Sequence, residues 1–336
     1  MAFSSRAVLP VWLLVAACWA GHSAAQSSVT LYGTIDLNLT RTNSGTSVNP
    51  GAGPRGVTVM HSGAGSRLGL RGHEDLGGGL YLGFHLEHRF YADTGEQDSQ
   101  TFFKGVSSLT LGSTQWGAFY MGRVVIPAFA VSCATEPTCW SFTSEPGQAY
   151  AWANYSGSVA ADSSSIRRNN TVGYRSPNLG GWSSEIAYTA GEGQRTPTVG
   201  WNVQYRNGPV YAGLGYDGED TQTRLFVAGG SYDFGAVRSL LTLADAKGGA
   251  TTPAYRAQSA SLSLVFPLSM GRVFMGAGHL QARATPADNE VRSTKVFVGG
   301  EYALSKRTKF YANAGIAKST GLTRSDAYDA GIRHAF

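Results

Sequence analysis

The sequence predicts an all-β protein, an antiparallel transmembrane β-barrel of 16 strands. The first observation is a strict alternation between Gly65 and Phe90. There leucines and a phenylalanine alternate with Arg, His and Glu on both sides of a Glu-Asp-Leu-Gly-Gly-Gly turn. The second is that the polar face is charged on both strands and that the pattern recurs to the end of the chain. A closed barrel with an apolar outside and a wet inside accounts for both.

The composition agrees with this fold class. Charged residues make up only 15% of the 336 residues, and glycine occurs 44 times. Beyond the first 25 residues no stretch approaches the roughly 18 consecutive apolar residues that indicate a membrane-spanning helix. If the chain crosses a membrane, it is therefore expected to do so with strands.

Each strand follows from the same period of two. Ile35 and Leu37 alternate with Asp36 and Asn38, and a polar loop is expected after this strand up to about Gly63. Short turns and longer loops then alternate, which is the layout of outer-membrane barrels. The expected strands are 29–40, one on each side of the turn within 65–90, 101–111, 116–123, 167–178, 182–190, 199–207, 210–217, 222–234, 236–246, 254–266, 270–283, 292–304, 307–318 and 325–336.

Residues 1–25 are expected to be a secretory signal peptide. Arg6 supplies the positive end, 8–20 the apolar middle and Ser23-Ala24-Ala25 the cleavage site, so the barrel would span 26–336. A retained anchor is the alternative, but the apolar run is shorter than a spanning helix requires. Loss of Arg6 leaves 26 basic and 22 acidic residues. That excess is too small and too dispersed to predict nucleic-acid binding.

One long stretch, residues 124–166, interrupts the alternation. It contains no Lys or Arg, and irregular segments of this length are usually functional or disordered. Cys133 and Cys139 lie in it, and an exported protein meets an oxidising compartment, so we expect a disulfide between them. Two free thiols are the alternative. No metal site is expected, because no histidine lies nearby to complete a ligand set.

We expect neither an enzyme nor a bound cofactor. The mature histidines are His61, His73, His85, His88, His279 and His334. No H-E-x-x-H motif, nucleophile elbow or phosphate-binding loop accompanies them. A barrel protease or phospholipase is one alternative, and an adhesin or scaffold barrel is another. The charged inner face and the long inward-type loop favour a channel over both.

Seven segments spread over the mature chain carry a resemblance. They are Gln26–Gly33, Gly65–Gly69, Glu74–Leu80, Arg168–Val172, Ser176–Asn178, Tyr302–Thr308 and Gly331–Phe336. They resemble the general porins of Gram-negative bacteria, in particular the family common in β-proteobacteria. The resemblance implies a homotrimer whose third extracellular loop, here 124–166, folds into the lumen. The outward row ending in Phe336 looks like the assembly signal that the barrel-insertion machinery recognises.

What the resemblance implies about function is a water-filled outer-membrane channel for passive diffusion of ions and small hydrophilic solutes. Outer-membrane lipid and lipopolysaccharide are the other expected partners. Two features depart from the family. It usually has an arginine early on the fourth strand, where this chain has Val106, with Lys104 two residues earlier on the same face. The pair Cys133 and Cys139 is also unusual in that loop.

The narrowest point of the pore is expected where inward-facing cations meet acids of the long loop. Arg67, Lys104 and Arg167 face inward by the alternation of their strands. Arg67 and Arg167 also match the constriction-wall arginines of the family. Glu136 and Glu145, the central acids of the long loop, are expected to stand opposite and to set a transverse field.

Further inward positions are expected to line the lumen. These are Asp36, Arg71, His85, Glu87 and Arg175. With His neutral, the constriction and lumen groups together carry five positive and four negative charges, which predicts a weak anion preference. Arg123 shares its parity with Phe119 and Met121, so we expect it to anchor the long loop rather than line the pore.

Overall fold

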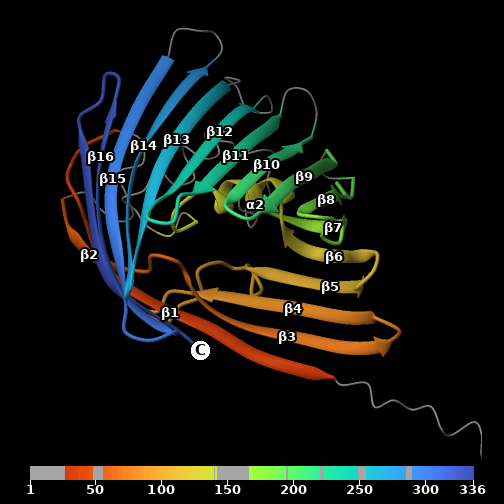
Figure 1. Cartoon of the computed structure of the whole chain (residues 1–336). Coiled ribbons are helices and arrows are strands. Elements are labelled where there is room, and N and C mark those ends of the chain that lie inside the picture. Colours follow the sequence, from red (N-terminus) through yellow and green to blue (C-terminus); the bar gives the residue numbers. More distant parts are fainter. Residues whose placement is uncertain are drawn as a thin grey trace, which may run out of the picture.

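A single antiparallel sheet closes on itself to form a barrel (Figure 1). The structure is a computed structural model, and it describes residues 27–47, 56–139, 141, 166–193, 196–219, 223–248, 255–284 and 290–336. The barrel closes because β1 pairs with β17 on one side and with β2 and β3 on the other. The predicted signal peptide lies outside the described residues, as does Glu145.

The elements follow one another around the ring in chain order. They are β1 (Ser28–Thr42), β2 (Thr58–His61), β3 (Ser66–Gly77), β4 (Leu80–Phe90), β5 (Val106–Ser113), β6 (Gly117–Val125), α2 (Pro127–Ala134), β7 (Arg167–Arg175), β8 (Trp182–Thr189), β9 (Thr198–Asn207), β10 (Val210–Gly218), β11 (Arg224–Asp233), β12 (Arg238–Gly248), β13 (Tyr255–Leu268), β14 (Gly271–Ala284), β15 (Glu290–Ala303), β16 (Thr308–Ser319) and β17 (Ser325–Ala335). The rim that holds the β16–β17 connection is called the long-loop rim below, and the rim that holds the β3–β4 connection is called the short-turn rim.

The prediction of a 16-stranded antiparallel barrel is confirmed. The described residues form seventeen strands, but β2 is only four residues long and continues the line of β3 along β1. Thr34 of β1 pairs with Arg67, and Asn38 pairs with His61, so β2 and β3 together occupy one place in the ring. The polar loop expected up to Gly63 therefore includes a short paired segment.

The strand expected at 101–111 begins later than predicted, at Val106. Local contacts of the preceding segment replace strand pairing there. The backbone N–H of Thr101 donates to Ser99 Oγ, and Lys104 Nζ lies 3.0 Å from Asp98 Oδ2. The prediction that Lys104 lies on a strand is therefore wrong. It lies in the connection between β4 and β5.

The outer wall is apolar and the inner wall is polar. Large exposed side chains such as Leu31, Leu214 and Val298 share one parity on their strands, whereas the opposite parity carries buried polar groups such as Asn202 and Asn313. Aromatic rings are in contact on the outer wall near both rims. Trp182 and Tyr205, and Tyr232 and Phe234, pack near the short-turn rim, and Trp201, Tyr216 and Phe226 pack nearer the long-loop rim. This is the banding of a membrane-spanning barrel.

The helix α2 lies inside the ring, against the inner face of β9, β10 and β11 (Figure 1). Asn202 Nδ2 on β9 donates to the carbonyl of Pro127 at 2.8 Å, and the hydroxyls of Thr135 and Thr242 are 2.7 Å apart. Gly213 and Gly229 leave room for Val131, because a Cβ at either position would lie 3.1–3.2 Å from its methyl groups. Among the described residues no helix is long and apolar enough to cross a membrane.

Candidate functional site

Four arginines gather on the inner wall of β3–β7. We call Arg67 on β3, Arg89 on β4, Arg123 on β6 and Arg167 on β7 the arginine cluster. The charges of Arg67, Arg89 and Arg123 all act electrostatically on the guanidinium of Arg167. The strands β3, β4, β6 and β7 contribute one arginine each, so the cluster requires the correct pairing of these strands as well as the correct parity.

Glu87 is the carboxylate at the centre of this cluster. Its Oε1 lies 2.7 Å from Arg89 Nη2, and its Oε2 lies 4.0 Å from Arg67 Nη1. The hydroxyl of Tyr32 on β1 donates to Oε2 at 2.8 Å. The side chain of Glu87 is nearly buried. Four guanidinium groups thus lie near this one carboxylate.

Backbone carbonyls hold the arginines in place. Arg67 Nη2 donates to the carbonyl of Ala64 at 3.1 Å, and Arg167 Nε donates to that of Gly105 at 2.7 Å. Gly105 itself must be small, because a Cβ there would lie 2.3 Å from Glu87 Oε1. Bonds to neutral carbonyls fix a guanidinium without cancelling its charge, so the cluster stays strongly basic.

Arg123 enters the cluster through a β-bulge. The pairing of β6 with β7 shifts by one residue between Gly122 and Val124, and Gly122 has a φ of 126°. The extra residue lies on β7, where Asn169 and Asn170 together stand opposite Arg123. On β6 the irregular point is Gly122, and the side chain of Arg123 after it is buried, unlike the exposed Phe119 and Met121.

Arg123 Nε donates to the carbonyl of Lys104 at 2.9 Å and its Nη1 to Asn169 Oδ1. These contacts make it an anchor for the segment before β5 and for β7. Most of the long loop, which the sequence led us to expect it to anchor, lies outside the described residues.

Two predicted cations are neutralised by neighbouring acids. The ammonium of Lys104 pairs with Asp98 at 3.0 Å. Arg175 Nε pairs with Glu185 Oε1 at 3.0 Å, and its guanidinium lies over the ring of Tyr120. Neither therefore adds a full unpaired charge to the lumen.

Asp36 faces inward as predicted but is fully buried. Arg333 Nε donates to its Oδ2 and Tyr311 OH to its Oδ1, at 2.8 and 2.5 Å. The N–H of Ala64 donates to the same carboxylate. Because these groups come from β16, β17 and the break between β2 and β3, Asp36 joins the two ends of the chain around the barrel seam.

Arg71 and His85 lie together on the inner wall below the cluster. Arg71 lies over the ring of Tyr32, 4.2 Å from its centre, and His85 Nε2 is 2.5 Å from the hydroxyl of Tyr32. Glu136 follows Thr135, which bonds to Thr242 on β12, so its backbone lies across the ring from β3. The side chain of Glu136 is nearly buried.

Two arginines near the site were absent from the predicted set. Arg89 has the same parity as His85 and Glu87 on one strand, and Arg333 has the parity opposite to the outward Ile332. Parity could have identified both. The partner of Arg333, Asp36, could not be found in that way, because the pairing of β17 with β1 joins residues from the two ends of the chain.

Cys133 and Cys139 are joined by a disulfide, with their Cα atoms 4.4 Å apart. The bond links the last turn of α2 to the residues that follow it. At the chain end, Phe336 pairs through its backbone with Gly33, and its ring covers that glycine. A Cβ at Gly33 would lie 2.2 Å from Phe336 Cζ.

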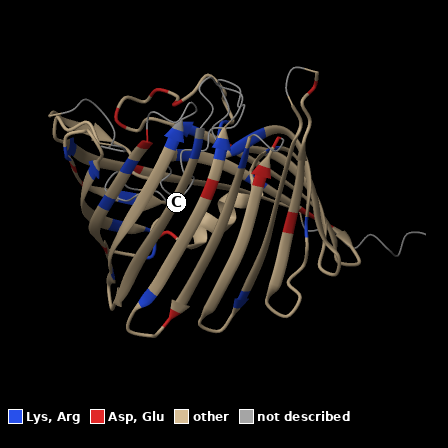
Figure 2. Ribbon diagram, turned by 90° about the horizontal axis from the view of Figure 1, so that it is seen from above, with Lys and Arg blue, Asp and Glu red and all other residues tan. Residues whose placement is uncertain are grey.

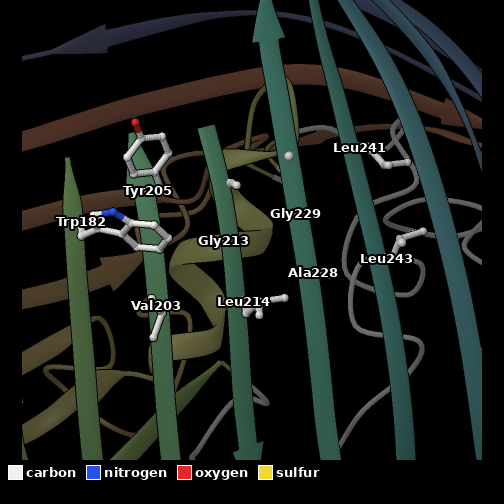
Figure 3. A pocket seen from close by; sticks show the side chains of 11 residues that line it. Trp182, Val203, Tyr205, Gly213, Leu214, Ala228, Gly229, Leu241 and Leu243 are labelled. Carbon is white, nitrogen blue, oxygen red and sulfur yellow. The ribbon is translucent and has the colours of Figure 1, made fainter. Parts of the chain in front are cut away.

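A large surface hollow lies on the outside of the barrel rather than in the lumen. It measures about 390 Å³ and is lined by Trp182, Val203, Leu214, Leu241 and Leu243 around the small residues Ala228 and Gly230 (Figure 3). In that view α2 lies behind the strands. The lining faces the lipid, so this hollow is not a passage for polar solutes.

Charged residues gather near the rims. Figure 2 shows Lys and Arg collected at strand ends along the rim with the longer loops. Among the described residues, no three His, Cys, Asp or Glu side chains are placed to hold a metal ion.

A closed barrel with an apolar outer band, aromatic rings near both rims and a charged inner wall defines a membrane channel of the outer-membrane type. The family model for the Gram-negative porin matches residues 11–322, and the chain belongs to this family. It is 31% identical to outer membrane porin protein 32 of Delftia acidovorans, over 94% of this chain and 96% of that protein. It is 29% identical to an outer membrane porin protein of Bordetella pertussis, over 95% of this chain and 97% of that protein.

Among solved structures, an anion-selective porin from Comamonas acidovorans aligns with a TM-score of 0.76 and 28% identity, over 93% of this chain and 100% of that chain. The predicted resemblance to β-proteobacterial porins is thus confirmed. The chain is an outer-membrane β-barrel channel of the Gram-negative type.

Proposed function

We propose that this channel is water-filled and lets ions and small hydrophilic solutes diffuse passively, with a preference for anions. The observation that carries the proposal is the arginine cluster, in which four guanidinium groups lie near the carboxylate of Glu87. Walls of low dielectric constant strengthen the field of such a cluster in a narrow passage. The similar Comamonas protein is described as anion-selective, which agrees.

The narrowest point is proposed to lie between the arginine cluster and the segment 124–166. The helix α2 of this segment rests on β9–β11, across the ring from β3 and β4 (Figure 1). The segment contains no Lys or Arg, and Glu136 and Glu145 are two of its acids. A basic wall and an acidic segment would set a field across the passage. This field would steer anions along one side and cations along the other.

The assembled channel is proposed to be a homotrimer without a chemical step or a cofactor. The trimer rests on the family resemblance. In the same way, Phe336 is proposed as the signal for the barrel-insertion machinery. Its aromatic side chain lies on the outer wall, where such machinery could contact it.

The proposal is tested with the purified protein in planar bilayers. Under a tenfold KCl gradient we expect stepwise conductance and a reversal potential on the anion side. Swelling of liposomes in small neutral sugars should show that uncharged solutes also pass. A reversal potential on the cation side would contradict the anion preference but not the channel function. Absence of conductance from correctly folded protein would instead favour an adhesin or scaffold role.

A further inference from the structure

A row of basic side chains crosses the outer wall at the long-loop rim. Arg224 on β11 pairs with Lys247 on β12, Lys247 pairs with Arg256 on β13, and Arg256 pairs with Arg283 on β14. We call these four residues the basic row. All four share the parity of the lipid-facing apolar residues on their strands, and the side chains of Arg256 and Arg283 are 55% and 58% exposed.

Without compensating acids, the basic row would lower the stability of the sheet. Like charges directly opposite each other on neighbouring strands destabilise their pairing. Two acids partly compensate. Asp245 pairs with Arg256 at 2.8 Å, and Glu290 pairs with Arg283 at 3.1 Å and also with Arg292. Five basic residues against two acidic ones still leave an excess of three positive charges on this outer patch.

The basic row lies at the level of lipid headgroups. One outward-facing position closer to the barrel middle, β11 has Phe226 and β12 has Asp245. These two residues pair with each other. Phe226 also packs against Trp201 and Tyr216 in the aromatic group. Such aromatic groups mark the membrane interface, and the long-loop rim is the extracellular one. Because outward positions along a strand repeat about every 7 Å, the basic row lies just above that interface, in the outer leaflet.

An apolar groove continues downward from the same two strands. Below Phe226 on β11, the outward positions are Ala228 and Gly230, which line the hollow of about 390 Å³ together with Leu241 and Leu243 of β12 (Figure 3). The small residues lower the wall between larger neighbours, so the groove could hold an extended hydrocarbon chain. The basic row and the apolar groove thus lie one above the other on the same strands of the outer wall.

We propose that the basic row binds the phosphate groups of lipid A, the phosphorylated sugar anchor of lipopolysaccharide, with one acyl chain in the groove. Neighbouring strands lie about 4.8 Å apart, so the four strands present cations over about 14 Å. This width suits a disaccharide that carries a phosphate at each end. Arginine donates two parallel hydrogen bonds to a phosphate. Gln258 and Gln281, one row below, donate to Asp245 and Glu290 and so help to hold the two acids of the patch.

The test compares binding of defined lipids to the intact, detergent-purified channel by native mass spectrometry. The wild type should bind diphosphoryl lipid A, and the R256Q/R283Q variant should bind it at least about tenfold more weakly, the loss expected for two hydrogen bonds to charged groups. The R256K/R283K variant keeps the charge and should retain most of the affinity. The control variant K306Q/R307Q removes two exposed cations at the short-turn rim and should bind as the wild type does.

The lipid itself is varied to separate phosphate from acyl contacts. Dephosphorylated lipid A should bind the wild type and R256Q/R283Q equally and weakly, and millimolar inorganic phosphate should not displace diphosphoryl lipid A. Equal affinity of wild type and R256Q/R283Q for diphosphoryl lipid A, at unchanged single-channel conductance, would overturn the proposal. Displacement by inorganic phosphate would do so too. Loss of the oligomer without loss of lipid would assign the basic row to subunit contact instead.

Discussion

Neutralising Arg89 should reduce the anion preference of the channel by an amount that can be estimated. Arg89 is bonded to Glu87 at 2.7–2.8 Å and belongs to the cluster of four positively charged arginines. Arg89→Gln removes one of these charges, and its amide can still donate to Glu87. We therefore expect a change in selectivity without loss of the fold.

The size of the effect follows from Coulomb's law. A unit charge about 7 Å from a permeating ion contributes about 0.6 kcal/mol in water, which is close to the thermal energy. Removing it lowers the anion occupancy and raises the cation occupancy, so without screening the permeability ratio falls about sevenfold. At 0.15 M salt the Debye length is about 8 Å, the interaction is more than halved, and the ratio falls only about twofold.

The assay is the reversal potential of Arg89→Gln channels, measured at two salt concentrations and compared with Arg89→Lys and Arg256→Gln. Arg89→Lys keeps the charge and should behave almost as the wild type does. Arg256→Gln removes an equal charge from the lipid-facing side and should change little. A shift in Arg89→Gln as small as that in Arg256→Gln, or one that does not grow as salt is lowered, would refute the location proposed for the constriction.

Three further outcomes test other parts of the structure. The thiols of Cys133 and Cys139 should resist alkylation until reductant is added, as mass spectrometry can show, and the bond should contribute roughly 2 kcal/mol to loop stability. Phe336→Ala uncovers Gly33 and should lower the amount of assembled, heat-modifiable protein while export across the inner membrane continues, which fractionation with immunoblotting would reveal. Gly122→Ala should cost about 1–3 kcal/mol of backbone strain and displace Arg123, because its Cβ would lie 2.2 Å from the carbonyl oxygen of Ser107; an unchanged urea midpoint and reversal potential would contradict this account of the bulge.

The barrel could be predicted because its period of two recurs in every strand. Parity alone placed Arg67, Glu87 and Asp36 on the inner face, where the structure has them. The register between strands was out of reach, since it depends on pairings such as that of β1 with β17. Burial of Asp36 under Tyr311 and Arg333 therefore could not be foreseen.

Local breaks in the alternation account for the remaining differences. Arg123 was assigned the outward parity because nothing in the sequence distinguishes Gly122, where β6 becomes irregular, from the other glycines among the 44. Lys104 was assigned to a strand because the turn contacts around Asp98 cannot be recognised from composition. In both cases the direction of a charged side chain was decided by contacts that the alternation of one strand does not encode.

The inner wall of β11–β14 carries apolar side chains whose inward direction the period of two does reveal. Leu225, Val227 and Leu280 have the inward parity and yet are apolar and buried. Exposing each of these side chains to water would cost about 1.5–3 kcal/mol of folding free energy relative to burial. A water-filled lumen therefore requires another segment of the protein to cover them. Ile126 and Val131, at the start of the irregular segment, provide that cover. An apolar inward patch therefore marks the wall on which an inner segment rests, and the opposite wall is left free for the charges that face the passage.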